Sequence, residues 1–136
     1  MGYQKNFDAW NEKKKLIHER RPPAHFKPGE VWWCSIGSNI GHEEDGKNEW
    51  FERPVCIIQR FGNELAWVVP LTTRPQNGVF SIQTMVNKTP NWAMVVHLDL
   101  LSARRLHRRL GNVSVATVIQ IRDKIIDLLK TSPSLE

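Results

Sequence analysis

Residues 41–58 read GHEEDGKNEWFERPVCII and carry the chain from a polar, acid-rich loop directly into an apolar run. The run from Val55 to Ile58 is typical of a buried β-strand, and the charged Arg53-Pro54 pair stands at its start. A rigid strand that fixes one end of an exposed loop is a common way of positioning functional groups. We therefore expect this loop and strand to form a site, with the rest of the chain as its scaffold.

Length and composition indicate one folded domain. The chain has 136 residues, of which 40% are hydrophobic and 24% are charged. Its net charge of +5 at pH 7 favours an anionic partner such as nucleic acid, although positive charge also aids solubility. Cys34 and Cys56 lie in apolar runs without metal-binding spacing, which indicates buried free thiols.

The sequence also predicts where the protein works. No apolar run approaches the roughly 18 residues that span a bilayer. The N-terminus is polar and lysine-rich and lacks the apolar core of a signal peptide. We therefore expect a cytoplasmic protein that does not bind membranes.

Helices are predicted at both ends of the chain. The first covers 6–21, with Asn6 as its cap, and Pro22-Pro23 ends it. Its apolar face carries Phe7, Trp10 and Ile17, and it either contacts a partner or, as we favour, docks on the rest of the chain. The second covers 115–130 and is capped by Ser114. Its predicted apolar stripe consists of Val115, Val118, Ile125, Ile126 and Leu129.

Short strands lie between the helices. They are expected over 30–36, 54–60, 65–71, 79–86, 92–98 and about 106–110, with a turn over 87–91. Short strands joined by turns and closed by one helix predict a mainly β, α+β fold, a small SH3-like barrel of about five to six strands. We predict an N-terminal helical extension with a proline-containing linker over 1–27 and a barrel domain over 28–136.

The spacing of polar residues argues against a metal site. His42-Glu43 lacks the second histidine of a zinc helix, and the histidines and cysteines never gather at zinc spacing, so no metal or cofactor is expected. Acid–base chemistry remains. An arginine fork such as Arg53 suits a phosphate, and a strand-end hydroxyl such as Thr72 can hold a phosphate oxygen. His42 or Glu43 could take the proton of a ribose 2′-hydroxyl.

The same residues have ordinary structural interpretations. Glu43 to Asp45 would then form a solvated loop, Arg53 would pair with Glu49 or Glu52, and Thr72-Thr73 would be turn residues. Both interpretations stay open on the residues alone.

The order of four motifs favours the functional interpretation. Together, these motifs resemble those of the PemK/MazF family of toxins from toxin–antitoxin pairs. The resemblance covers about residues 28–130. Its motifs are Glu30-Val31-Trp32-Trp33, Asn39-Ile40-Gly41-His42-Glu43, Arg53-Pro54-Val55 with Ile57-Ile58, and Val69-Pro70-Leu71-Thr72-Thr73. The segment Leu101-Ser102-Ala103-Arg104-Arg105-Leu106 also fits it.

The resemblance implies a homodimeric SH3-like barrel that cleaves single-stranded RNA (mRNA) at specific sequences without a metal. The products would be a 2′,3′-cyclic phosphate and a 5′-hydroxyl. It also implies neutralisation by a cognate antitoxin, in a complex that binds DNA. Arg53 corresponds to the family's catalytic arginine and Thr72 to its strand-end threonine, while Glu43 and His42 correspond to catalytic or RNA-contacting loop residues. The candidate RNA-binding residues are Lys47, Trp50, Thr73, Arg74, His97, Arg104, Arg105 and Arg108.

Two features leave alternatives open. Val96 stands where the family has a polar or acidic residue, and Asp99 stands where a basic residue is usual, which would repel a phosphate. A catalytically weakened barrel that only binds RNA or protein, or a gyrase-poisoning toxin of the same fold, therefore remains as an alternative. The basic cluster 104–109 could bind RNA or an acidic antitoxin, or simply be solvated. Trp50 and Phe51 could stack on bases or anchor the loop.

Overall fold

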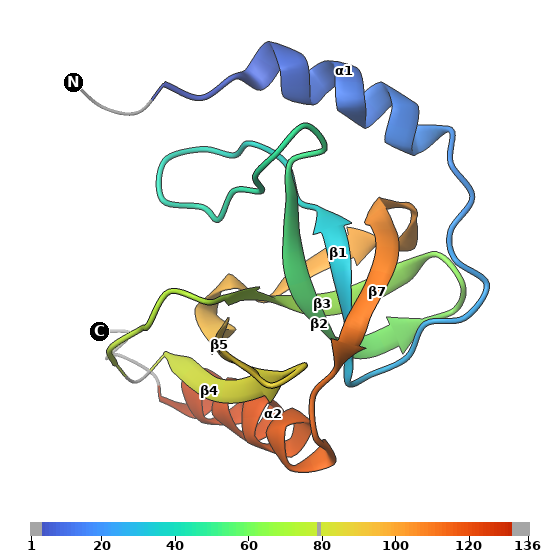
Figure 1. Cartoon of the computed structure of the whole chain (residues 1–136). Helices are drawn as coiled ribbons and strands as arrows, with labels where there is room; N and C mark the ends of the chain where they lie inside the picture. The colour runs from blue at the N-terminus through green and yellow to red at the C-terminus, as the bar shows by residue number, and fades with distance from the viewer. Residues whose placement is uncertain (1–3, 79, 132–136) are drawn as a thin grey trace.

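The computed structural model describes residues 4–78 and 80–131 and has a curled antiparallel sheet with a helix at each end of the chain (Figure 1). In chain order, the elements are α1 (Phe7–His18), β1 (Glu30–Ser35), β2 (Glu52–Phe61), β3 (Leu65–Thr72), β4 (Ser81–Val86), β5 (Thr89–Met94), the 3-10 helix η1 (Val95–His97), β6 (Asp99–Ser102), the 3-10 helix η2 (Ala103–Arg105), β7 (Leu106–Asn112) and α2 (Val115–Lys130). The predicted α+β class is confirmed. No helix in the described part of the chain is long and apolar enough to cross a membrane.

The sheet has seven strands, where five to six were expected. Their order is β4-β5-β3-β2-β1-β7, and β6 pairs with β3 outside this path. Leu65–Val68 of β3 pair with β6, whereas Leu71 and Thr72 at the end of β3 pair with β5. Within the described residues no strand ladder joins β7 to β4 or β6, so the sheet is barrel-like without being closed.

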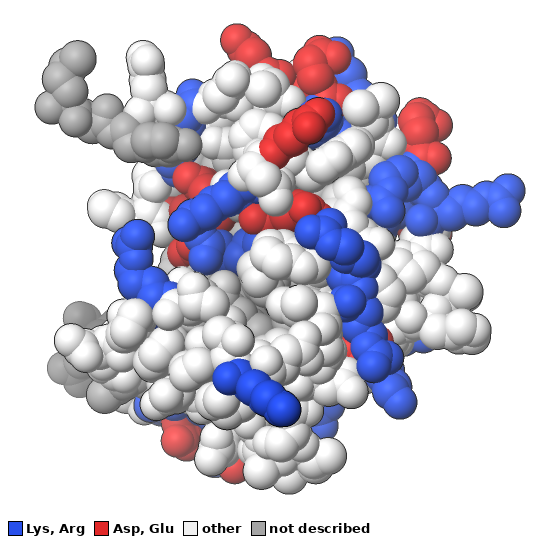
Figure 2. Space-filling view, viewed as in Figure 1, with Lys and Arg blue, Asp and Glu red and all other residues white. Residues whose placement is uncertain are grey.

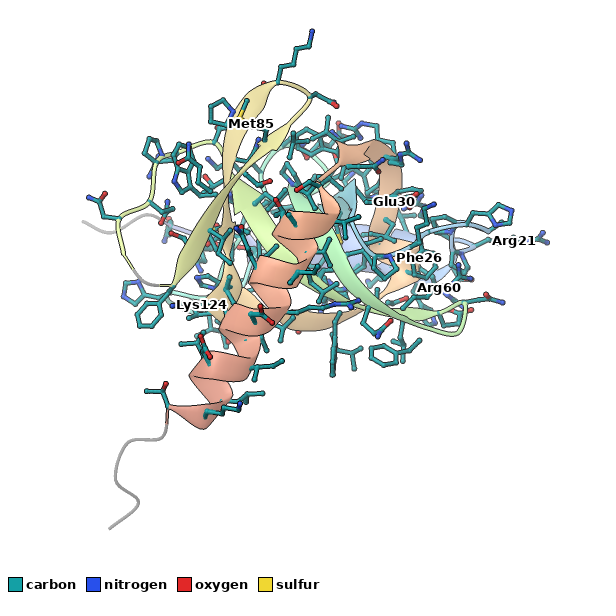
Figure 3. The ribbon with its side chains drawn as sticks, turned by 90° about the horizontal axis from the view of Figure 1, so that it is seen from below. Arg21, Phe26, Glu30, Arg60, Met85 and Lys124 are labelled. Carbon is teal, nitrogen blue, oxygen red and sulfur yellow. The ribbon has the colours of Figure 1, made fainter. Side chains whose placement is uncertain are left out.

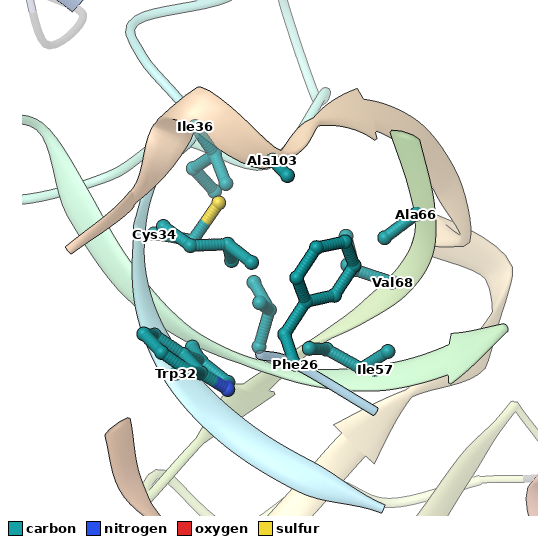
Figure 4. Packing of buried hydrophobic residues seen from close by; sticks show 10 residues of the cluster. Phe26, Trp32, Cys34, Ile36, Ile57, Ala66, Val68 and Ala103 are labelled. Atoms are coloured by element: carbon teal, nitrogen blue, oxygen red, sulfur yellow. The ribbon is translucent and has the colours of Figure 1, made fainter. Parts of the chain in front are cut away.

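Both faces of the central strands are buried, because two cores take alternate side chains. In β2, Val55 and Ile57 point into the core inside the curled strands, which Phe26 of the linker also fills (Figure 4). Cys56 and Ile58 point into a second core, on the side that α2 covers (Figure 3). This arrangement explains the uninterrupted apolar run of β2, since a strand buried on both faces needs no polar alternation.

The N-terminal segment is packed onto the sheet. Trp10 and Ile17 of α1 are 5% and 4% exposed, so the helix docks on the chain as favoured, while Phe7 is 49% exposed. Phe26 follows in the linker, and the guanidinium of Arg60 lies 4.3 Å from the centre of its ring (Figure 3). Arg60 also donates a hydrogen bond of 2.9 Å to the carbonyl of Phe26. The linker between α1 and β1 is therefore fixed at its start by the docked helix and near its end by the contacts of Phe26 with Arg60.

The capping residues of both helices are confirmed. The side chain of Asn6 accepts a hydrogen bond of 3.0 Å from the amide of Ala9, and Ser114 accepts one of 3.1 Å from the amide of Thr117. α1 ends at His18 and not at residue 21.

The predicted single apolar stripe of α2 is wrong. Val118 and Ile125 pack against the second core. Val115, Ile126 and Leu129 are 76%, 47% and 79% exposed. The helix therefore carries apolar side chains on two faces, and the described chain covers one of them.

The hairpin of β4 and β5 also differs from the prediction. Its turn consists of Asn87 and Lys88, both with positive φ (49° and 65°), instead of five residues. β5 ends at Met94, and η1 replaces the predicted strand up to residue 98. β4 begins at Ser81; Val79, where that strand was expected to begin, lies outside the described residues.

Candidate active site

A cleft of about 1130 Å³ lies between the β1–β2 loop (residues 36–51) and the end of β3. β2 and β3 are paired neighbours, so the start of β2 and the end of β3 meet at one edge of the sheet. This edge brings together seven of the residues predicted from the sequence. They are Glu43, Lys47, Arg53, Thr72, Thr73, Arg74 and His97.

Arg53 is fixed at the base of this cleft. Its side chain is 12% exposed, and Nη2 lies 2.7 Å from Oε1 of Glu44. Nε donates a hydrogen bond of 2.9 Å to the carbonyl of Asp45, and Nη1 donates one of 3.4 Å to the carbonyl of Leu71. The guanidinium therefore connects the loop to the end of β3, and its acidic partner is neither of the predicted ones, Glu49 and Glu52.

Glu44 is the functional candidate that the sequence did not single out. Its carboxylate is 22% exposed, and its second oxygen, Oε2, lies 3.9 Å from Nε2 of His97. Both side chains line the cleft. An arginine, a carboxylate and an imidazole are therefore adjacent, which is a set of groups capable of binding an anion and moving a proton.

The two predicted proton carriers occupy other positions. Glu43 lines the cleft but is exposed, and its Oε1 accepts a hydrogen bond of 3.1 Å from the amide of Ile40. This contact closes a tight turn, because the amide of Glu43 donates to the carbonyl of Ile40. His42 is exposed and does not line the cleft. Neither residue forms a hydrogen bond or an ion pair with Arg53, whose partners are Asp45, Leu71 and Glu44.

Thr72 lies at the β3 end of the cleft, as its strand-end position predicted. Its hydroxyl oxygen accepts a hydrogen bond of 3.1 Å from the amide of Arg74, so the hydroxyl hydrogen is available to an acceptor in the cleft. Thr73 and Arg74 line the cleft as exposed residues.

The remaining RNA-binding candidates lie outside the cleft. Trp50 packs on His107, with ring centres 5.4 Å apart, and Lys13 lies 4.3 Å from the centre of the Trp50 ring. Phe51, which does line the cleft, packs on Trp10. Both aromatic residues therefore anchor the loop.

The basic cluster is largely paired with carboxylates. Arg108 binds the buried Glu52 at 3.0 Å, and Arg104 binds Glu64 at 3.3 Å. Arg109 binds the buried Glu30 at 3.2 Å. Figure 2 shows the Lys and Arg side chains on this view of the surface, with acidic side chains set among them. Part of the positive charge expected to attract RNA is therefore neutralised within the chain.

His107 joins the N-terminal segment to β7. Its Nδ1 lies 2.7 Å from Nη1 of Arg20, and its Nε2 lies 2.5 Å from Oγ of Ser35. Arginine can only donate, so Nδ1 accepts and the hydrogen of the neutral ring lies on Nε2. Burial lowers the pKa of His107, and the charges of Arg20 and Arg108 lower it further against the opposing effect of Glu52.

The thiols are buried and free, as predicted. Burial raises the pKa of Cys34 and of Cys56 to about 12, so neither thiol is a nucleophile for the cleft. Among the described residues, no three His, Cys, Asp or Glu side chains gather as a possible metal site.

Val96 and Asp99 lie beside the cleft and not in it. Both line a neighbouring cavity of about 330 Å³, which shares Glu43, Glu44 and His97 with the cleft. Val96 is 55% exposed. The aspartate expected to oppose a phosphate is therefore displaced from the lining around Arg53.

Solved structures of similar fold include MazF (Form-I) from Deinococcus radiodurans, with a TM-score of 0.64 and 20% identity, over 81% of this chain and 98% of that chain. An endoribonuclease in complex with its cognate antitoxin from Mycobacterial species has a TM-score of 0.59 and 16% identity, over 81% of this chain and 100% of that one. Mycobacterium tuberculosis toxin MazF-mt6 has a TM-score of 0.57 and 13% identity, over 76% and 99%. At these identities the likeness concerns the fold.

No curated protein sequence matches the chain. The sequence model of the PemK-like, MazF-like toxin of type II toxin-antitoxin system matches residues 27–129, which contain every residue of the cleft. The chain therefore belongs to the PemK/MazF toxin family.

Proposed function

We propose that this protein is an endoribonuclease toxin that cleaves single-stranded RNA without a metal. The observation that carries the proposal is the Arg53 guanidinium, held in the cleft beside the carboxylate of Glu44 and the strand end at Thr72. The similar structures named above include an endoribonuclease bound to its antitoxin, which supports the same activity for this chain.

Arg53 would bind the scissile phosphate. In the described structure two of its five N–H groups donate to carbonyl oxygens, which leaves three for Glu44 and for a phosphate. Because those carbonyls already fix the guanidinium, little reorganisation is needed when negative charge develops on the phosphate oxygens. The hydroxyl of Thr72 would donate to a non-bridging oxygen.

Glu44 and His97 would carry the protons. The carboxylate of Glu44 takes the proton of the ribose 2′-hydroxyl, and the 2′-oxygen attacks phosphorus. The bond from phosphorus to the 5′-oxygen breaks, and that oxygen takes a proton from the imidazolium of His97. The products are a 2′,3′-cyclic phosphate and a 5′-hydroxyl. Glu43 and His42, the carriers expected from the sequence, remain candidates for contacts with the RNA.

Further predictions about partners, location and domain division belong to this proposal. A cognate antitoxin would neutralise the toxin, since two of the similar structures are MazE-MazF complexes from Deinococcus radiodurans. The toxin would act in the cytoplasm as a homodimer, and the complex with the antitoxin would bind DNA. The division into an extension over 1–27 and a barrel over 28–136 also stays a prediction.

The first prediction tests the activity itself. Purified protein should cleave varied single-stranded RNAs in the presence of a chelator, and the fragments should carry 2′,3′-cyclic phosphate and 5′-hydroxyl ends. Arg53→Ala should lower kcat/KM by on the order of a hundredfold or more, because it removes a preorganised cation from the phosphate. Lys130→Ala removes an exposed positive charge at the end of α2 and serves as the control.

Other outcomes select the alternatives. RNA binding without product would favour a binding module, which the neighbouring Val96 and Asp99 motivate. DNA breaks that depend on gyrase, with RNA intact, would favour the gyrase-poisoning activity. Cleavage that Arg53→Ala leaves unchanged would contradict the site.

A further inference from the structure

The N-terminal segment before residue 27 lies outside the family match, yet it makes specific contacts with the β1–β2 loop. α1 lies along this loop in Figure 1. Trp10 packs against Gly37 at the base of the loop, where a Cβ on Gly37 would lie 2.3 Å from the indole ring. Only glycine allows this approach, and the φ of Gly37 is also positive (94°). The helix and the base of the loop are therefore fitted to each other.

Lys5 contacts the loop more directly. Its ammonium group lies 3.0 Å from Oδ2 of Asp45 and donates a hydrogen bond of 3.0 Å to the carbonyl of Gly41. It also donates to the carbonyl of Asn39. A lysine has three donors, and all three find loop oxygens, although the Lys5 side chain is only 14% exposed. The ammonium thus acts as an internal cation around which this part of the loop folds.

Asp45 connects Lys5 to the cleft, because it contacts both Lys5 and Arg53. One carboxylate oxygen binds Lys5, and the other accepts a hydrogen bond of 2.7 Å from the amide of Asn39. The carbonyl of the same residue accepts from Nε of Arg53 at 2.9 Å, and its chain neighbour Glu44 binds Nη2 of Arg53. A displacement of Asp45 would therefore disturb the positions of both Glu44 and Arg53 in the cleft.

The loop needs such a cation because of its own charge. Glu43, Glu44 and Asp45 are consecutive, and their carboxylates repel one another. Arg53 offsets the charge of Glu44, and Lys5 offsets that of Asp45. Lys13 adds a weaker contact, with its ammonium 3.2 Å from the exposed Glu49.

We propose that Lys5 is a positioning residue, which holds Asp45 so that Glu44 and Arg53 stay in contact in the cleft. This role rests on the proposed nuclease function. It gives the N-terminal extension a part in the activity of a cleft to which residues 4–27 contribute no lining side chain.

The experiment compares Lys5→Met, Lys5→Arg and Lys15→Met in the full chain. Lys15→Met is the matched control, since it removes the same charge from a lysine of the same segment that pairs with Glu12 and not with the loop. Lys5→Met should lower kcat by on the order of tenfold with little change in KM, because misplaced groups slow the chemical step more than binding. Lys5→Arg should restore most of the loss, and the control should match the wild type.

Hydrogen exchange provides a readout that does not depend on cleavage. The amides of Asn39 and Gly46 donate within the loop, and their exchange should accelerate in Lys5→Met but not in Lys15→Met. Unchanged exchange, or faster exchange with an unchanged kcat, overturns the positioning role. If the wild type cleaves no RNA while exchange responds as expected, the proposed function fails and the contact between Lys5 and the loop stands.

Discussion

Glu44, in place of the Glu43 expected from the sequence, is the carboxylate that our proposal uses as the base. Its carboxylate contacts Arg53 at 2.7 Å, whereas Glu43 holds a turn of the loop. Glu44→Gln keeps the shape of the side chain but removes the proposed base, so kcat for RNA cleavage should fall by on the order of a hundredfold. Glu43→Gln should lose less. A larger loss in Glu43→Gln than in Glu44→Gln, with thermal stability unchanged in both, would assign the proton transfer to Glu43.

Only part of the cleft could be predicted from the residues. Arg53 and Thr72 stand at the ends of two regular strands, so their positions follow from the strand pattern. The acids 43–45 lie in an irregular loop, where the backbone decides which carboxylate faces Arg53. That backbone includes the positive φ of Gly41 (56°), which a glycine permits but does not require, and it contacts a distant lysine, which no local pattern indicates.

The docking of α1 should depend on pH through His107. Burial and two arginine charges lower its pKa, so the unfolded chain binds more protons as the pH falls below the ordinary value of 6.5. The contribution of the neutral ring is therefore complete above that pH and is lost progressively below it. The free energy of unfolding should fall between about pH 7.5 and about pH 5.5, and the fall should be smaller in His107→Gln.

Denaturant titrations at both pH values measure this effect, and the comparison with the variant isolates the contribution of His107. Equal falls for wild type and His107→Gln would contradict the assignment to His107. Since Nδ1 of this ring accepts from Arg20, the loss should be accompanied by easier proteolysis of the α1 segment.

Element ends show what periodicity can and cannot predict. Caps are local, so Asn6 and Ser114 marked the helix starts correctly. The end of β5 was missed because the apolar run Ala93-Met94-Val95-Val96 continues past Met94, so the sequence carries no turn signal where the 3-10 helix begins. The turn forms where the chain leaves β5 for β6, and its cause is the tertiary path, not the residue pattern.

The fold as a whole was predictable because strand signals and turn signals agree along most of the chain. The sequence did not predict which apolar helix surfaces pack against the core and which stay exposed. α2 is apolar on two faces, and the sequence gives no indication that Val118 faces the core while Val115 faces out. The number of strands was also uncertain, since β6 has four residues and lies between two 3-10 turns.

A contiguous apolar patch on the barrel is relevant to the proposed homodimer. Phe61, Leu65, Trp67 and Leu100 are 41%, 40%, 44% and 50% exposed. The rings of Phe61 and Trp67 are 5.0 Å apart, and strand register places Leu65 opposite Phe61 and Leu100 opposite Trp67. Exposed patches of several large apolar side chains usually mark an interface, and we expect a second copy of this chain to cover this one.

Trp67→Glu tests this interface, because a buried, unpaired carboxylate opposes association. Light scattering after size-exclusion chromatography should give the mass of a dimer for the wild type and that of a monomer for Trp67→Glu. Phe7→Glu is the control, since Phe7 is similarly exposed at 49% but lies on α1. A dimer that persists in Trp67→Glu would show that the interface is not at this patch, and the outer face of α2 would be the next surface to test. A monomeric wild type would remove the homodimer from the proposal.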